Sequence, residues 1–281
     1  MNKVVIVIQF NNAYFRFGLT LLRSLEKYAK NAVKVAYTVN LTDDEIKTLK
    51  NISSELIIIN SRVFLWGRLL RNFMANRKVG VFMDAISRYS NCQHTSTPAH
   101  QHTSTPAHQH TSTPAHQQPD NIYILLDADL LLRMPIENLL NALGKHNVGL
   151  VYREIAFGFH VKFNSSVVIV SGDGIKLIDE WNRQMKRRWV IFSTDEKLTR
   201  FEILKKKKEG SPRPLYVRRG KWFWDQITLY EAVRKLQIDF SILEANKFIN
   251  ANFDACAAIW SGHNDKKDVV YKKYIDELKL E

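Results

Sequence analysis

One apolar run of the chain ends abruptly in two carboxylates, and this feature constrains the fold most. Residues 122–126 are all apolar and lead directly into Asp127, Ala128 and Asp129. Because the run is apolar at every position, it predicts a strand buried on both faces of a largely parallel sheet. Ligands of open α/β folds bind at the carboxyl edge of such a sheet. Two carboxylates there suit a hard divalent cation, and a solvated acidic turn is the alternative.

Strands and helices alternate through the first half of the chain. We predict strands over residues 4–8, 33–39 and 56–59, with helices over 13–29, after Thr42, and over 65–89. Thr42 and Glu45 form a capping-box pattern. The second half predicts strands over 148–152 and 167–170 and helices over 175–188 and 225–236. This order predicts an α/β fold with a mixed, mostly parallel sheet flanked by helices.

A tandem repeat interrupts this pattern. Residues 94–101 read His-Thr-Ser-Thr-Pro-Ala-His-Gln, and residues 102–109 and 110–117 repeat them. The repeats lack large apolar side chains and carry a proline every eight residues, so they predict a flexible surface loop over 93–118. Weak metal binding by the repeat histidines is the alternative. We therefore expect a single domain over residues 1–265, interrupted by this loop, and a charged tail over 266–281.

Composition and charge limit the location and the partners. The chain has no apolar run of membrane-spanning length, and Cys92 and Cys256 match no metal spacing, so we expect a cytoplasmic protein. Of the net charge of +13, much lies in residues 181–222, with 14 Lys and Arg against 4 Asp and Glu. This basic zone predicts an anionic partner, such as the inner face of a membrane, a phosphorylated glycan or nucleic acid. A solvated helix face is the alternative.

Several motifs follow one another in an informative order. They are Asn11-Asn12-Ala13-Tyr14, Asp127-Ala128-Asp129, Phe163-Asn164-Ser165-Ser166, Phe223-Trp224-Asp225-Gln226 and Gly262-His263. The ordered set resembles the family 8 glycosyltransferases of GT-A fold, which include glycogenin and the galactosyl- and glucosyltransferases of lipopolysaccharide synthesis. The resemblance covers nearly the whole chain except the repeats and roughly the last fifteen residues.

This resemblance implies a metal-dependent, retaining transfer of a hexose from a nucleotide sugar, with UDP-hexose as the expected donor and a glycan or glycolipid as acceptor. It implies a Mn²⁺ or Mg²⁺ ion held by Asp127, Asp129 and His263. Asp225 and Gln226 are the implied catalytic residues. The implied contacts to the nucleotide sugar are Asn11, Tyr14, Arg88, Asp127, Ala128, Asn164, Ser165 and Lys266.

The chain departs from the family pattern at three places. Ser166 stands where the family has glycine. The family's Gly-x-x-Lys-Pro-Trp spacing is missing after His263, so the phosphate contact falls to Lys266 or its neighbour. The family also has an arginine in the helix before the Asp-x-Asp strand. Arg88 is the nearest candidate, and Arg77 or Lys78 are the alternatives.

Each site residue also has a structural interpretation. Asn11 suits a polar turn, with Tyr14 in the core, and Asn164 suits a turn between two strands. Asp225 suits a helix N-cap, and His263 a surface or core position. Two other functions remain open. A nucleotidyltransferase needs a glycine-rich loop, but residues 9–14 contain no glycine. A basic nucleic-acid-binding module leaves the carboxylates unexplained and predicts salt-sensitive binding.

Overall fold

The computed structural model describes residues 3–53, 55–91, 121–152, 163–192, 215–218, 224–244, 249–250 and 259–261, with a few residues between 272 and 279. The octapeptide repeats, His263 and Lys266 lie outside the described residues, as does most of the charged tail. A seven-stranded sheet has the order β10-β6-β7-β4-β1-β2-β3. Its strands are β1 (Val4–Asn11), β2 (Val33–Val39), β3 (Ile57–Ser61), β4 (Ile122–Asp127), β6 (Val148–Tyr152), β7 (Phe163–Ser171) and β10 (Ser241–Glu244).

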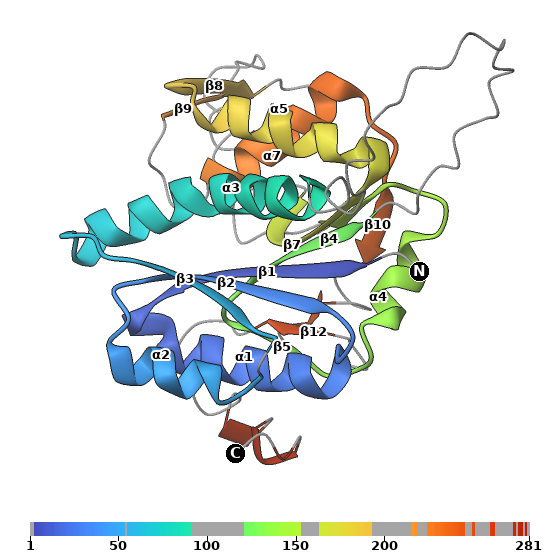
Figure 1. Cartoon of the computed structure of the whole chain (residues 1–281). Coiled ribbons are helices and arrows are strands. Elements are labelled where there is room, and N and C mark those ends of the chain that lie inside the picture. Colours follow the sequence, from blue (N-terminus) through green and yellow to red (C-terminus); the bar gives the residue numbers. More distant parts are fainter. Residues whose placement is uncertain are drawn as a thin grey trace, which may run out of the picture.

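The sheet is mixed and mostly parallel, which confirms the fold class predicted from the sequence. Strand β7 runs antiparallel to both β4 and β6, and the remaining neighbours pair in parallel. Helices cover both faces (Figure 1). These are α1 (Phe15–Tyr28), α2 (Asp43–Lys50), α3 (Gly67–Asn91), α4 (Glu137–Leu143), α5 (Lys176–Met185) and α7 (Trp224–Leu236), with 3-10 turns η1 (Asn12–Tyr14) and η2 (Gly172–Ile175).

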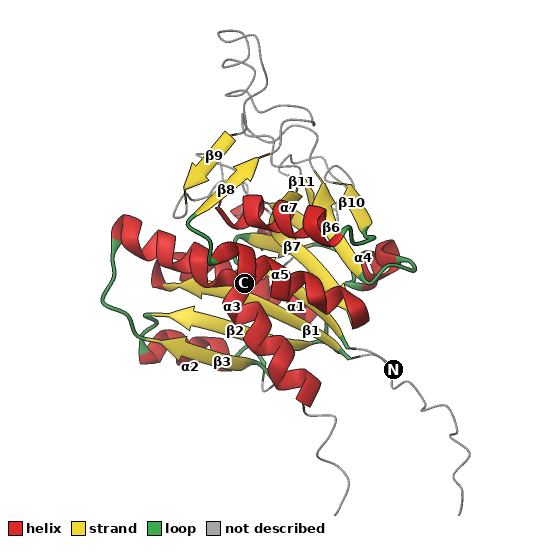
Figure 2. Cartoon of the chain, turned by 90° about the horizontal axis from the view of Figure 1, so that it is seen from above, coloured by secondary structure: helices red, strands yellow, loops and turns green. Residues whose placement is uncertain are grey.

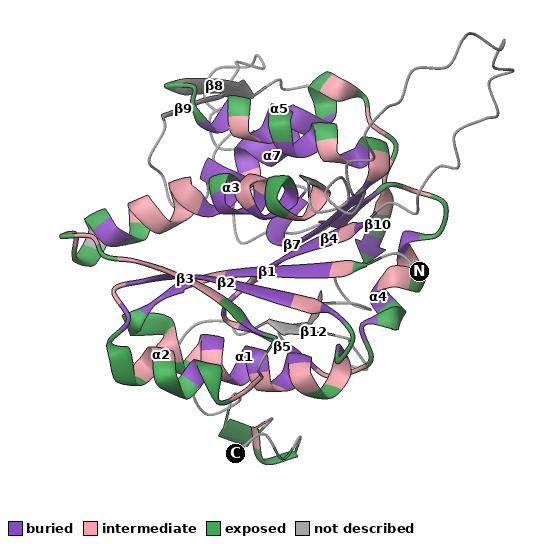
Figure 3. Cartoon of the chain, in the orientation of Figure 1, coloured by how far each residue is buried: buried purple, intermediate pink, exposed green. Residues whose placement is uncertain are grey.

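Two apolar cores lie on opposite sides of the sheet, with α3, α5 and α7 over one face and α1 and α4 over the other. The view from above places α3, α5 and α7 across the strands (Figure 2). The central strands are buried along most of their length (Figure 3). Burial on both faces explains why residues 122–126 are apolar at every position.

Local sequence signals placed several elements correctly. Strands β2 and β6 have the predicted bounds, and Thr42 and Glu45 form the predicted capping box at the start of α2. Strand β7 is longer than predicted, because it begins at Phe163 and includes the polar residues Asn164 to Ser166. The interpretation of Asn164 as a turn between two strands is therefore wrong.

Two smaller sheets complete the described structure. One has the order β11-β12-β5, and the other pairs β8 with β9. Their strands are β5 (Leu130–Leu132), β8 (Trp189–Phe192), β9 (Leu215–Arg218), β11 (Ile249–Asn250) and β12 (Ile259–Ser261). Among the described residues, no helix combines the length and the apolar character that crossing a membrane requires.

Candidate functional site

The Asp-x-Asp motif lies where the sequence predicts it, at the carboxyl edge of the main sheet. Asp127 is the last residue of β4 and pairs with Gln9 of β1. Asp129 follows in the two-residue turn that leads into β5. Strand β12 pairs with β5 and ends at Ser261, opposite Leu130. The chain therefore leaves β12 beside Asp129, two residues before His263 in the sequence.

A buried lysine joins the Asp-x-Asp motif to the Asp-Gln motif. The Nζ atom of Lys78, on α3, lies 2.5 Å from Oδ1 of Asp127 and 3.5 Å from Oδ2 of Asp225. It also donates a hydrogen bond of 3.1 Å to Oγ of Ser165, which donates in turn to Oδ2 of Asp225 at 2.6 Å. Residues from α3, β4, β7 and α7 thus meet in one polar network, although they lie up to 147 positions apart in the chain.

The network keeps opposite charges together at the edge of the core. Burial by itself lowers the pKa of Lys78, but the negative charges of Asp127 and Asp225 outweigh burial and raise that pKa above its ordinary value. Burial first, and then the negative charge of Asp129, raise the pKa of Asp127 to about 6 against the opposing attraction of Lys78. Lys78 is therefore a permanent cation that faces two carboxyl groups.

Two buried polar atoms at this site have no hydrogen-bond partner among the residues that the structure describes. They are Oδ1 of Asp225 and Oγ of Ser166. Asp225 is 6% exposed and Ser166 is 4% exposed. The register of β7 shifts against β6 here, and Oδ1 of Asn164 accepts a hydrogen bond from the Ser166 backbone. Unpartnered buried polar atoms are rare in folded proteins, and at a sheet edge they are suited to a polar ligand.

Asp225 does not cap a helix, so that interpretation is wrong. It is the second residue of α7, and its side chain contacts Lys78 and Ser165. Its backbone carbonyl accepts a 2.8 Å hydrogen bond from Nε1 of the buried Trp181, on α5. Gln226 follows in the same turn and is half-buried. The contact with Trp181 fixes the first turn of α7, and with it the position of the Asp225 carboxylate.

Asn11 and Tyr14 lie at the same edge, at the end of β1. Oδ1 of Asn11 accepts a hydrogen bond from the Tyr14 backbone and caps the short turn η1. Asn11 therefore has the structural role of a polar turn residue. Tyr14 is 45% exposed and stacks at a tilt on Phe17. The interpretation of Tyr14 as a core residue is wrong, and its ring is accessible to a ligand.

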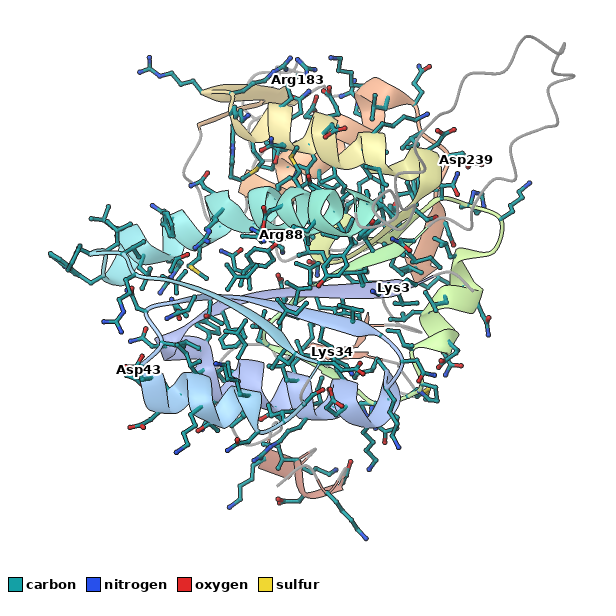
Figure 4. All side chains as sticks on the ribbon, in the orientation of Figure 1. Lys3, Lys34, Asp43, Arg88, Arg183 and Asp239 are labelled. Carbon is teal, nitrogen blue, oxygen red and sulfur yellow. The ribbon has the colours of Figure 1, made fainter. Side chains whose placement is uncertain are left out.

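Arg88 does not reach the Asp-x-Asp motif. It pairs with Asp84, and it lies ten residues beyond Lys78 on α3, about 15 Å along the helix axis (Figure 4). The two residues after it contact the start of β4, at the other end of that strand: the Tyr89 carbonyl accepts from Asn121, and Ser90 bonds to Tyr123. Lys78, one of the two alternatives, is the cation that the structure places beside Asp127. Arg77 contacts Ser61 at the end of β3.

A sequence signal for Lys78 does exist. Lys78 lies four residues before Phe82 and seven before Ala85, both fully buried, so it occupies the apolar stripe of α3. A lysine in such a stripe needs a buried anion, and Asp127 and Asp225 supply two. The role of Ser165 as a bridge between Lys78 and Asp225 has no comparable local signal.

The residues predicted to hold a metal ion lie only partly within the described structure. Within the described part of the chain, no three His, Cys, Asp or Glu side chains gather closely enough to hold a metal ion. The contact between Lys78 and Asp127 is made to the Oδ1 atom of the carboxylate. Carboxylates such as Asp127 and Asp129, together with an imidazole such as that of His263, suit Mn²⁺ or Mg²⁺ in their chemistry.

No family model and no curated protein matches this chain. Among solved structures it is similar to the apo form of glycosyltransferase GlyE of Streptococcus pneumoniae TIGR4, with a TM-score of 0.47 and 13% identity over 97% of this chain and 60% of that one. It is also similar to galactosyltransferase LgtC in complex with donor and acceptor sugar analogs, with a TM-score of 0.41 and 11% identity over 95% and 94% of the two chains. A third similar structure is TarS of S. aureus in complex with UDP, with a TM-score of 0.43 and 11% identity over 99% and 64%.

GlyE and LgtC are glycosyltransferases, the class that the sequence motifs resemble, and the TarS structure contains UDP. The chain spans about 60% of the length of GlyE and 94% of the length of LgtC. Because the TM-scores are below 0.5 and the identities are low, the likenesses do not assign an activity to this chain. The residues of the site at the carboxyl edge of the sheet bear directly on the activity.

Proposed function

We propose that this chain transfers a sugar from a nucleotide-sugar donor bound at the carboxyl edge of the sheet. The observation that carries the proposal is the Lys78 ammonium between Asp127 and Asp225, beside an unpartnered buried oxygen of Asp225. The buried ammonium holds two carboxylates in place at the end of β4, where Asp127 can ligate a divalent cation, and an unpaired acceptor suits a ligand rich in hydroxyl groups. The ordered motifs that resemble family 8 supply the reaction class.

The proposed cofactor is Mn²⁺ or Mg²⁺, held by Asp127, Asp129 and His263. The position of Asp127 at the end of β4 and the end of β12 opposite Leu130 support this assignment. When bound, the ion supplies positive charge against the negative charge that develops on the leaving diphosphate. The ion pairs of Lys78 with Asp127 and Asp225 hold these two carboxylates in place before the donor arrives.

The other residues of the edge bind the donor and set its orientation. The exposed ring of Tyr14 stacks on the base, which we propose to be uracil, and Asn11 fixes the turn that carries Tyr14. Asp225 accepts hydrogen bonds from hydroxyl groups of the hexose with its unpartnered oxygen. Asn164 and Ser165, in β7, contact the donor sugar, as the resemblance implies. Gln226 faces the anomeric carbon, and the transfer retains anomeric configuration, as the resemblance implies.

A screen of nucleotide sugars tests this proposal. We expect one UDP-hexose to raise the melting temperature and to be slowly hydrolysed when Mn²⁺ is present. Asp127→Asn and Asp129→Asn should abolish hydrolysis while the circular dichroism spectrum stays unchanged. Asp239→Asn is the matched control, because Asp239 is exposed and pairs with His146 away from the site (Figure 4). The proposal is wrong if folded Asp127→Asn hydrolyses the donor at the original rate in the presence of a chelator.

We also propose that the basic zone over residues 181–222 holds the protein at the inner face of an anionic membrane, near a glycolipid acceptor. Lys186, Arg187 and Arg188 are exposed at the end of α5. Lys205 to Lys208 lie outside the described residues. Each basic residue near an anionic bilayer contributes about 1 kcal/mol. Neutralising Lys186, Arg187 and Arg188 should weaken vesicle binding and leave hydrolysis of a soluble donor unchanged.

A further inference from the structure

Three large apolar side chains are exposed together where α3 begins. Phe64 is 96% exposed, Trp66 is 77% exposed and Leu69 is 60% exposed, and we call these three residues the apolar tip. They account for half of the large exposed apolar side chains in the described part of the chain. The start of α3 and the loop before it project beyond the edge of the sheet (Figure 1). Grouped apolar exposure of this kind marks an interaction surface in a folded monomer.

Hydrogen bonds fix the backbone on both sides of the apolar tip. The amide side chain of Asn40 clamps Val63 through two hydrogen bonds, of 2.7 Å and 2.9 Å. On the other side, the carbonyl of Trp66 accepts hydrogen bonds from the backbones of Leu69 and Leu70 in the first turn of α3. Residues 64–66 therefore have anchors on both sides, and exposure of Phe64 and Trp66 is a property of the folded chain.

Arginines lie on both sides of the apolar tip in the sequence. No acidic residue occurs between Glu55 and Asp84, and Arg62 and Arg71 are both exposed. Acidic side chains open α2, and the first of them, Asp43, lies 3.6 Å from Arg62. Both members of that pair are highly exposed, so water and salt screen it.

We propose that the apolar tip inserts into the headgroup region of an anionic lipid bilayer. Tryptophan and phenylalanine next to arginine are the side chains that favour this interface, since the rings enter the apolar boundary while the cations contact lipid phosphates. A second protein molecule fits less well. Two aromatic side chains of about 150–250 Å² each and one leucine fall short of the roughly 800 Å² that each partner buries in a standard interface.

The tip is separate from the basic zone, but both lie toward the same end of the molecule. The hairpin of β8 and β9, which follows the exposed cations at residues 186–188, and the start of α3 share that end in both views (Figures 1 and 2). One bilayer can therefore contact both. The proposal does not depend on glycosyl transfer, because it concerns the binding of lipid alone.

Sedimentation with vesicles of phosphatidylcholine and phosphatidylglycerol tests the proposal. We expect the full-length protein to bind at low salt. The double variant Phe64→Ser, Trp66→Ser should bind about tenfold more weakly or worse, with an unchanged unfolding midpoint and unchanged hydrolysis of any soluble donor. Ile242→Ser is the matched control, because Ile242 is 51% exposed on β10, and it should bind like the original protein.

A fluorescence experiment gives a second readout. Brominated lipids should quench part of the tryptophan emission, and Trp66→Phe should remove that part while vesicle binding persists. The proposal is overturned if the double serine variant binds as well as the original protein, or if the original protein does not bind at low salt. It is also overturned if, without lipid, ultracentrifugation shows self-association that Trp66→Ser abolishes, because a second copy then covers the tip.

Discussion

Lys78 is the residue on which the candidate site depends most. Its side chain and that of Asp225 are each 9% exposed, and that of Asp127 is 37% exposed. Removing a buried charge from water is costly, and here two carboxylates and the Ser165 hydroxyl offset the cost. Buried ion pairs of this kind contribute little net stability, but the loss of one partner leaves an uncompensated charge.

We expect the substitution Lys78→Met to lower the free energy of unfolding by about 3–5 kcal/mol, because Asp225 then keeps a buried charge without its cation. Urea unfolding followed by circular dichroism measures the change. The double variant Lys78→Met, Asp225→Asn should recover much of the loss. Lys176→Met, at an exposed lysine, is the matched control and should stay within about 0.5 kcal/mol. A loss from Lys78→Met no larger than the control's would show that the network is not coupled.

The contact between α1 and β1 positions the Asn11–Tyr14 turn, and a glycine makes that contact close. A Cβ atom added at Gly18 of α1 would lie 2.7 Å from the ring of Phe10 on β1. Phe10 is buried, so its ring has little room to move. By contrast, a Cβ atom at Gly80, on the exposed side of α3, meets nothing within 4 Å.

These two glycines should therefore respond in opposite directions to the same substitution. We expect Gly18→Ala to destabilise the fold by about 1–3 kcal/mol through overpacking. Gly80→Ala should stabilise it by roughly 0.5–1 kcal/mol, since alanine is the better helix former. Thermal unfolding of the two single variants decides the matter. Equal effects would mean that α1 does not pack against Phe10 as described.

A carboxylate links α5 to α7, the helix that carries Asp225. Glu180 accepts hydrogen bonds from Arg183 and Gln184 within α5, and Lys235 of α7 lies 3.5 Å away. Burial by itself raises the pKa of Glu180, but these donors and charges outweigh burial and hold that pKa below its ordinary value. The folded state thus favours ionised Glu180.

The sign of the pH effect follows from this lowered pKa. Ionised Glu180 stabilises the fold at pH values above its ordinary pKa of 4.5, and the contribution is lost as the pH falls through the lower folded pKa. Glu180→Gln should therefore cost about 1–3 kcal/mol at pH 7 and much less near pH 3. Urea unfolding of both proteins at the two pH values measures this difference. Glu55→Gln, at an exposed residue, should show no such trend; a gap for Glu180→Gln that is independent of pH would contradict the assignment.

At the scale of the whole molecule, the end of α3 and the start of β4, which flank the octapeptide repeats in the sequence, lie close together. The side chain of Asn121 donates a 3.3 Å hydrogen bond to the Tyr89 carbonyl, and Ser90 and Tyr123 are joined by a 2.9 Å hydrogen bond. The repeats themselves carry no large apolar residue that could add to a core. A short connection is therefore long enough to join α3 to β4.

We expect replacement of residues 94–117 by a short Gly-Ser linker to leave the melting temperature within a few degrees of the original. The physical reason is that a shorter surface loop changes only a small closure entropy. Differential scanning calorimetry gives the melting temperature, and hydrolysis of the donor gives the activity. A large loss of either after a clean replacement would show that the repeats belong to the working structure.

Much of the fold could be predicted because its signals are local. A continuous apolar run such as residues 122–126 can be satisfied only by burial on both faces, and the capping box at Thr42 and Glu45 defines a helix start within four residues. The same locality placed Asp127 and Asp129 at the carboxyl edge of the sheet. It also explains why β7 was predicted too short, since Asn164 to Ser166 are polar and their burial depends on partners elsewhere.

The tertiary structure alone decided which cation faces the carboxylates. The sequence by itself determined an α/β sheet with an acidic pair at its edge and a basic helix before it, but it left Arg88, Arg77 and Lys78 as alternatives. The choice depends on how α3 is rotated and where it crosses the sheet, and packing against α5 and α7 sets both. Lys78 meets Asp127 and Asp225 because α3 packs against the sheet, α5 and α7 at the same time, and no single stretch of sequence contains that information.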